Sequence, residues 1–199
     1  MSIEQDTKKQ FAIVFDTSDW EQFKSIAESY LRQAACLRKK HLRGVPRGRL
    51  LARNSQKRLF VGVAVELLLK SVYLLNGYRI NELTDRNANL QWPYTAQQVA
   101  GSGFVLDPDR TKMLDDCIQH LADVLNLGGD KDDVLEGLKI AKVYRNKEGH
   151  IVTSTHHYVP SDYRKIESAL TLLYHHAFRQ KLELHFSIAN GEKPRFRVT

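Results

Sequence analysis

The chain has 199 residues, of which 42% are hydrophobic, and this is enough to bury a core and favours one domain over two. The formal net charge of +7 and the pI near 9.4 favour acidic partners, such as nucleic acid or an anionic membrane, and leave the fold open. The polar first ten residues lack the apolar core of a secretory signal, and Cys36 and Cys117 are too far apart to suggest a disulfide scaffold or a zinc site, so we expect a cytoplasmic protein.

The first predicted elements are a short strand and a long helix. FAIVF, at residues 11–15, is an apolar run rich in strand formers. Ser18 is a candidate N-cap for a helix that runs to about Leu42, because apolar residues recur at steps of three and four. These residues are Trp20, Phe23, Ile26, Ala27, Tyr30, Leu31, Ala34 and Leu37.

A second helix is predicted after the GVPRGR break, from Asn54 or Ser55 to Leu75, with Asn76-Gly77 as its stop signal. It is apolar around most of its circumference, so we expect it to be the central helix of the fold. Glu66 and Lys70 interrupt its most apolar stretch, which is also short for a membrane span. We therefore expect no membrane helix.

Residues 78–107 carry several turn signals and few periodic apolar positions, so they predict a long connection, with a short helix around residues 95–99. In this segment Trp92 and Tyr94 could stack on unpaired bases, but anchoring of the loop is the favoured interpretation. A third helix is predicted from Pro108 to Gly128-Gly129.

The fourth predicted helix is capped by Asp130 and leads directly into Arg145, and the fifth begins at Ser161 and has apolar positions as far as Leu182. Asn190-Gly191 then divides HFSIA from KPRFRV as a type I′ hairpin turn would. The sequence therefore predicts a mainly α fold, a bundle of four to five helices, with a small β-sheet from the N-terminal strand and the C-terminal hairpin.

The positive charge is concentrated between Ser29 and Val65, a stretch without Asp or Glu. Such a block either forms a solvated surface or follows a phosphate backbone, and we hold the two interpretations as equal. Arg47, Arg49 and Arg53 are the best candidates for RNA binding.

The segment VYRNKEGHI, at 143–151, places an arginine five positions before a histidine. On an unbroken helix Arg145 and His150 would point about 140° apart. Gly149 can end the helix and turn the imidazole back toward the guanidinium. The simpler alternative is that Gly149 is only a stop signal and that both flanking side chains are solvated.

Arg145 and Asn146, followed by His150 at the end of the fourth helix, resemble the motif of the HEPN superfamily of helical-bundle proteins. The second helix, AVELLLKSVYLLNG at 64–77, with its Glu66 and Lys70, is also similar to that family. The resemblance covers about residues 18–185. It implies a single HEPN-like domain over residues 1–199, with terminal extensions 1–17 and 186–199.

The resemblance implies a metal-independent ribonuclease without a cofactor, in which the ribose 2′-hydroxyl attacks the adjacent phosphorus. The residue types suit this chemistry, because histidine titrates near neutral pH and arginine presents a charged fork to phosphate oxygens. His150 would move the proton, Arg145 would stabilise charge, and Asn146 would hold the imidazole or a phosphate oxygen. Glu66 and Lys70 either form a bundle salt bridge, which is the favoured interpretation, or support the site from behind.

Acid and base are both needed, and the motif supplies one histidine per chain, so we expect a homodimer with a composite active site. The resemblance further implies a toxin or phage-defence effector that has an RNA target and an antitoxin or other regulatory partner. A subset of the family has a Tyr two residues after the His that is adenylylated, whereas this chain has Val152. That mode of control is therefore not expected here.

The main alternative is a bundle of the same fold without cleavage activity, serving as an RNA-binding or protein-interaction module. A helical DNA-binding protein is a weaker alternative, because no recognition-helix signature is evident. His156-His157 and His175-His176 could suggest a metal site, but adjacent helical residues project about 100° apart, and no acidic partner is evident nearby. We expect no metal.

Overall fold

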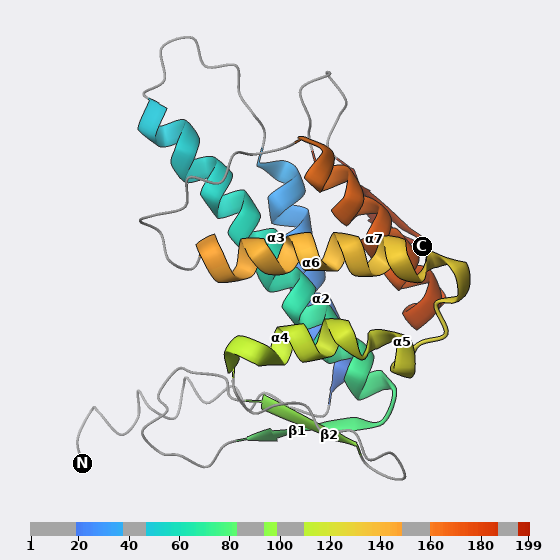
Figure 1. Cartoon of the computed structure of the whole chain (residues 1–199). Helices are drawn as coiled ribbons and strands as arrows, with labels where there is room; N and C mark the ends of the chain where they lie inside the picture. The colour runs from blue at the N-terminus through green and yellow to red at the C-terminus, as the bar shows by residue number, and fades with distance from the viewer. Residues whose placement is uncertain (1–18, 38–46, 83–93, 99–109, 149–159, 187–194) are drawn as a thin grey trace, which may run out of the picture.

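The computed structural model describes residues 19–37, 47–82, 94–98, 110–148, 160–186 and 195–199, and this part of the chain is mainly α-helical (Figure 1). Four helices form the bundle: α2 (Trp20–Cys36), α3 (Arg47–Leu75), α6 (Lys131–Glu148) and α7 (Pro160–Phe178). The predicted mainly α bundle is confirmed. Within these ranges, no helix has the length and apolar character needed to cross a membrane.

Helix α3 is the central element, as its apolar circumference predicts. It packs against α2 on one side and is crossed by α6 on the other, and α6 in turn packs against α7. The buried side chains that fill these contacts come from all four helices, and they include Phe23, Ala27, Leu31, Ala34, Val61, Ala64, Val65, Leu68, Leu69, Val72, Val134, Leu138, Ala141, Ile166, Leu170 and Leu173.

The start of α2 is fixed by an aspartate. The Asp19 carboxylate accepts hydrogen bonds from the backbone N–H of Glu21 at 2.9 Å and of Gln22 at 3.2 Å. These are two of the N–H groups that a helix cannot satisfy within itself. The predicted cap at Ser18 is therefore wrong by one residue, and the helix ends at Cys36 instead of near Leu42.

Replacing Asp19 by alanine should lower the free energy of unfolding by about 1 kcal/mol, because the two N–H groups lose their acceptor. Urea unfolding followed by circular dichroism measures this loss. Asp19→Asn, which keeps the acceptor oxygen, should cost much less. An equal loss in both variants would contradict the capping role.

Helix α3 begins at Arg47, seven or more residues before the predicted start, so the RGR segment belongs to the helix rather than to a break. Its end agrees with the prediction. The chain leaves the helix after Leu75, and Gly77 has φ +88°, a left-handed conformation that glycine adopts without a steric cost.

The connection after α3 contains strands instead of the predicted short helix. Strand β1 (Tyr78–Glu82) pairs antiparallel with β2 (Tyr94–Gln98), which occupies most of the segment expected to be helical. The two strands lie beneath α4 in Figure 1. The sequence of residues 94–98 carries only a weak helical signal and does not reveal that β1 is its pairing partner. Pairing with β1 outweighs this weak signal.

The third predicted helix is broken into two. Helix α4 (Arg110–Gln119) ends before His120, α5 (Leu121–Val124) is a single turn, and the short 3₁₀ helix η1 (Gly128–Asp130) leads into α6. Asp130 directly precedes α6, where the sequence predicts its cap; it is also the last residue of η1, and its carboxylate lies 2.9 Å from Nε2 of His176.

The C-terminal hairpin is present as β3 (Leu182–His185) and β4 (Arg195–Val198), which pair antiparallel. The fifth helix therefore ends at Phe178, and Leu182 belongs to β3. Leu182 pairs with Val198, whereas a regular ladder closed by a two-residue turn at Asn190-Gly191 would pair it with Thr199. The turn itself and the predicted N-terminal strand at 11–15 lie outside the described residues.

Candidate functional site

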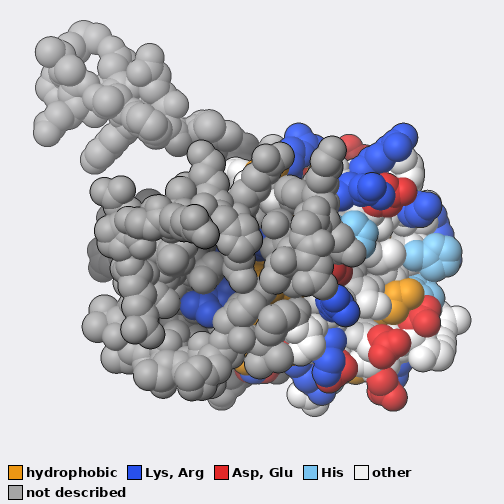
Figure 2. Space-filling view, turned by 90° about the horizontal axis from the view of Figure 1, so that it is seen from above, with side chains coloured by type: hydrophobic (Ala, Val, Ile, Leu, Met, Phe, Trp, Pro, Cys, Tyr) orange, Lys and Arg blue, Asp and Glu red, His pale blue; other side chains and the backbone are white. Residues whose placement is uncertain are grey.

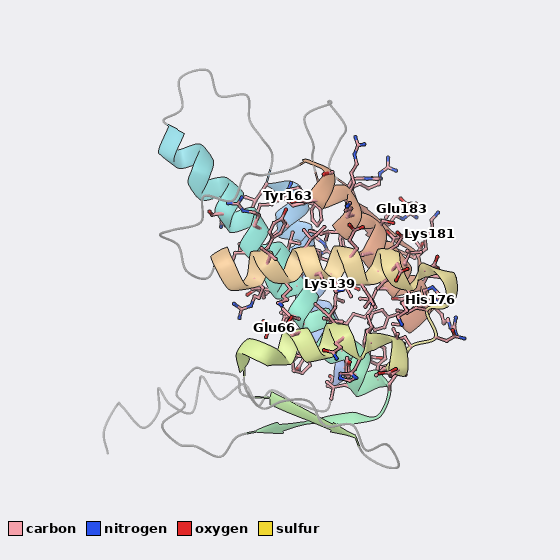
Figure 3. All side chains as sticks on the ribbon, viewed as in Figure 1. Glu66, Lys139, Tyr163, His176, Lys181 and Glu183 are labelled. Carbon is pink, nitrogen blue, oxygen red and sulfur yellow. The ribbon has the colours of Figure 1, made fainter. Side chains whose placement is uncertain are left out.

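Arg145 lies in the last part of α6 and reaches across to α3. Its Nε donates a hydrogen bond of 2.6 Å to one carboxylate oxygen of Glu66, and Nζ of Lys70 donates one of 2.6 Å to the other oxygen. The Glu66 side chain is 17% exposed and that of Lys70 is 6% exposed, while that of Arg145 is 38% exposed. Figure 3 places Glu66 on α3 just past its crossing with α6. The three residues therefore form one ionic cluster, and Arg145 is its solvent-facing member.

The charges of this cluster decide the protonation state of Glu66. Burial acts to raise the pKa of the Glu66 carboxyl, but the Lys70 ammonium and the Arg145 guanidinium outweigh it and hold the pKa below its usual value. Glu66 is therefore ionised at neutral pH, and with two cations and one anion the cluster carries a net charge of +1.

The bond from Arg145 to Glu66 uses only part of the guanidinium group. The bond to Glu66 uses Nε, so the distal Nη1 and Nη2 atoms are not engaged by that carboxylate. A guanidinium group held at Nε is restricted in its orientation and can still present two parallel N–H groups to an oxyanion. The cluster can therefore bind an anion such as phosphate at the end of α6.

The other predicted catalytic residues lie at or beyond the end of this helix. The backbone of Asn146 is helical, because α6 continues to Glu148, but its side chain is outside the described residues. Gly149, His150 and Val152 are also outside the described residues. The predicted approach of His150 to Arg145 therefore stays a prediction.

Glu66 and Lys70 are the residues for which the sequence left two interpretations open. The salt bridge between them is present, as the favoured interpretation predicts. The bond from Arg145 to the same carboxylate joins this salt bridge to the candidate site, across 79 positions of sequence. The Glu66 carboxylate therefore both forms the salt bridge with Lys70 and binds Arg145 of the candidate site.

Arg47, Arg49 and Arg53 lie in the first turns of α3, and their side chains are outside the described residues. In Figure 1 this end of α3 and the C-terminal end of α6 lie on the same side of the bundle. Seen from above, in Figure 2, the described surface with its mixed Lys, Arg, Asp and Glu side chains lies on the opposite side of the molecule.

One member of the basic block is not available to a polyanion. Lys57 is 7% exposed, and its ammonium lies 5.0 Å from the ring centroid of Tyr163 and 5.4 Å from that of Phe186. Glu167 is also buried nearby and accepts a hydrogen bond from the backbone N–H of Phe186. Burial raises the pKa of Glu167 despite this bond and the neighbouring Lys57. Lys57 thus belongs to the core contacts between α3, α7 and the C-terminal hairpin.

Of the two histidine pairs, the structure describes His175 and His176. His156 and His157 lie outside the described residues. His176 has an acidic partner, Asp130, which is 46 positions away in sequence, and this pair joins the end of α7 to the start of α6. Across the described ranges, no three His, Cys, Asp or Glu side chains are grouped as ligands of one metal ion.

Two residues on the Glu66 face of α3 were not singled out from the sequence, and one of them, Gly62, lies against Arg145. Gly62 and Arg58 precede Glu66 by one and two helical turns on the same face. Arg58 is partly buried, with Nη2 3.4 Å from Oγ of Ser55. The interval of four residues from Arg58 through Gly62 and Glu66 to Lys70 is a sequence signal that could have identified both.

Comparison of the chain with protein-family models, with curated proteins and with solved structures found no match.

Proposed function

We propose that this protein is a metal-independent endoribonuclease with the Arg145–His150 segment as its catalytic centre. The single observation that supports this most is the position of Arg145, which is anchored through Nε on the Glu66 carboxylate, so that this bond does not use its distal N–H groups. An anchored, partly exposed guanidinium is suited to the negative charge that develops on a phosphate during phosphoryl transfer.

His150 belongs to the same site in this proposal. It follows Glu148, the last residue of α6, by two positions, and two residues of chain span at most about 7 Å. This tether keeps the imidazole near the end of α6 that carries Arg145 and Asn146. A histidine in this place can exchange protons at neutral pH.

The proposed reaction is an internal transfer of the phosphodiester. The 2′-oxygen attacks the adjacent phosphorus and loses its proton to a general base, while the bond from phosphorus to the 5′-oxygen breaks and that oxygen receives a proton. One product ends in a 2′,3′-cyclic phosphate and the other in a 5′-hydroxyl. Arg145 would neutralise the charge on the non-bridging oxygens.

The remaining parts of the proposal concern partners. A twofold dimer would bring two copies of Arg145 and His150 to one cleft and supply the acid and the base from different chains. Arg47, Arg49 and Arg53 would bind the RNA backbone, because the first turns of α3 extend on the same side of the bundle as the end of α6. The similarity to HEPN proteins favours a toxin or defence effector controlled by a partner protein.

The competing proposal is a module of the same fold that does not cleave RNA. Its support is that Arg145 is already paired with Glu66, so the arginine could serve only to join α6 to α3. Both proposals allow RNA binding, and only the first requires chemistry at phosphorus.

Incubation of the purified protein with mixed cellular RNA separates them. We expect fragments with 2′,3′-cyclic phosphate and 5′-hydroxyl ends, formed equally well with excess EDTA, because no metal ion takes part. The matching DNA should remain intact, since it lacks the attacking 2′-hydroxyl. Intact RNA under these conditions, or cleavage that stops with EDTA, would contradict the ribonuclease proposal.

A further inference from the structure

The crossing of α3 and α6 is unusually close at one point. A Cβ atom at Gly62 would lie 2.5 Å from the backbone nitrogen of Arg145, 2.7 Å from its Cα and 2.8 Å from its Cβ. These are atoms of a packed helix, which cannot move aside as the end of a flexible side chain can. Here α6 therefore lies directly on the backbone of α3, and the residue that it brings there is Arg145.

Local helix preference does not account for a glycine at this position. Gly62 lies inside the 29-residue helix α3, where glycine is among the least favourable residues. Position 62 is buried, and no larger side chain would fit between the two helices. The glycine is therefore explained by packing.

The same face of α3 then presents the partner of the arginine. Glu66 follows Gly62 by four residues and Lys70 follows Glu66 by four, so the three lie in one row along the helix. Gly62 admits the backbone of Arg145, Glu66 accepts the hydrogen bond from Nε at 2.6 Å, and Lys70 neutralises the other oxygen of Glu66. Each of the three residues in this row therefore contributes to the placement of the Arg145 side chain.

We propose that Gly62 is a positioning residue for the candidate site. By lacking a Cβ atom, it holds the backbone of Arg145 at the separation from α3 at which the Glu66 carboxylate reaches Nε. The expected effect of Gly62 on RNA cleavage rests on the proposed ribonuclease function. Its expected effect on the contact between Arg145 and Glu66 does not depend on that function.

The test compares Gly62→Ala with a matched glycine. Gly137, on α6, lies at the other close crossing, where a Cβ would contact the Cβ of Ala169 and lie 2.5 Å from the carbonyl oxygen of Lys165. Both substitutions force two helices apart, so both should lower the urea midpoint. Only Gly62→Ala moves α6 at Arg145.

The interaction between Arg145 and Glu66 is measured by a double-mutant cycle of Arg145→Met and Glu66→Gln, using urea unfolding in three backgrounds. We expect the two substitutions to be non-additive in the wild-type and Gly137→Ala backgrounds and additive in the Gly62→Ala background. RNA cleavage per folded molecule should fall about 100-fold in Gly62→Ala, because a shift near 1 Å is enough for such a loss, and should be retained in Gly137→Ala.

Equal coupling between Arg145 and Glu66 in the Gly62→Ala and wild-type backgrounds would overturn the proposal. If the wild-type protein does not cleave RNA, the ribonuclease function fails, and the cycle still tests the role of Gly62. If Gly62→Ala does not fold, Glu66→Asp provides the test, since at a fixed separation of the helices the shorter carboxylate should lose its coupling to Arg145. Full coupling in Glu66→Asp would then contradict the proposal.

Discussion

Replacing Arg145 by alanine is expected to lower the rate of RNA cleavage by about 100- to 1,000-fold, the effect of removing one charged donor from a transition state. Replacing His150 by alanine should lower this rate by about 100- to 10,000-fold, because it removes the imidazole that transfers protons at the 2′- and 5′-oxygens. Both variants should remain folded. In Arg145→Ala, Lys70 still neutralises the Glu66 carboxylate.

The measurement is the initial rate of RNA cleavage, with circular dichroism and urea unfolding as checks of the fold. Lys139→Ala is the matched control, because Lys139 is an exposed cation on the same helix (Figure 3). Arg145→Lys keeps the charge and removes the planar fork, so most of the activity should also be lost. Full activity in Arg145→Ala would exclude this residue from catalysis and favour the binding-module alternative.

The second large effect is expected on stability. Glu66→Gln should lower the free energy of unfolding at pH 7 by roughly 3 kcal/mol, because the 5% exposed Lys70 would remain buried without its counter-charge. The value is at the lower end of the range for buried pairs, since the Glu66 side chain keeps 17% exposure. Glu136→Gln is the control, because Glu136 and Lys165 form a salt bridge with side chains 53% and 47% exposed, and such pairs contribute less than about 1 kcal/mol.

The variant Glu66→Gln also tests how the free energy of unfolding depends on pH. The pKa of Glu66 is lower in the folded protein than in the unfolded chain, so the unfolded state binds a proton first as the pH falls. The stability that Glu66 contributes is therefore fully present above its unfolded pKa of about 4.3 and is lost as the pH falls through the lower folded value. The difference in free energy of unfolding between wild type and Glu66→Gln should be constant from pH 7 to about pH 5 and should shrink in more acid solution. A difference that grows below pH 4 would contradict the assignment.

The helices that the sequence predicted best are those whose apolar residues repeat without interruption. The stripes of α6 and α7 are buried at Val134, Leu138, Ala141, Ile166 and Leu170, because a repeat near 3.6 residues defines a face before any partner is known. The end of α3 at Gly77 was also correct, since it rests on local turn chemistry, and the two strands of the C-terminal hairpin do pair.

The errors concern features that depend on distant residues. Strand β2 exists because β1 pairs with it, and the local pattern of residues 94–98 carries no trace of that partner. The contact of Asp130 with His176, a residue 46 positions away, is likewise absent from the local pattern. Such choices are made by tertiary contacts, which outweigh propensities of a few tenths of a kcal/mol per residue.

The features of the candidate site also fall into two groups, those that follow from the sequence and those that depend on the tertiary structure. The sequence by itself determined that Arg145 and Asn146 lie near the end of one helix, and that Glu66 and Lys70 lie one turn apart on another, because both facts follow from spacing along a helix. Only the tertiary structure decided that Glu66 also binds Arg145 and that Gly62 lets the two helices approach. The physical reason is that a contact between residues 79 positions apart depends on how two helices pack, and packing is fixed by the shapes of both surfaces together.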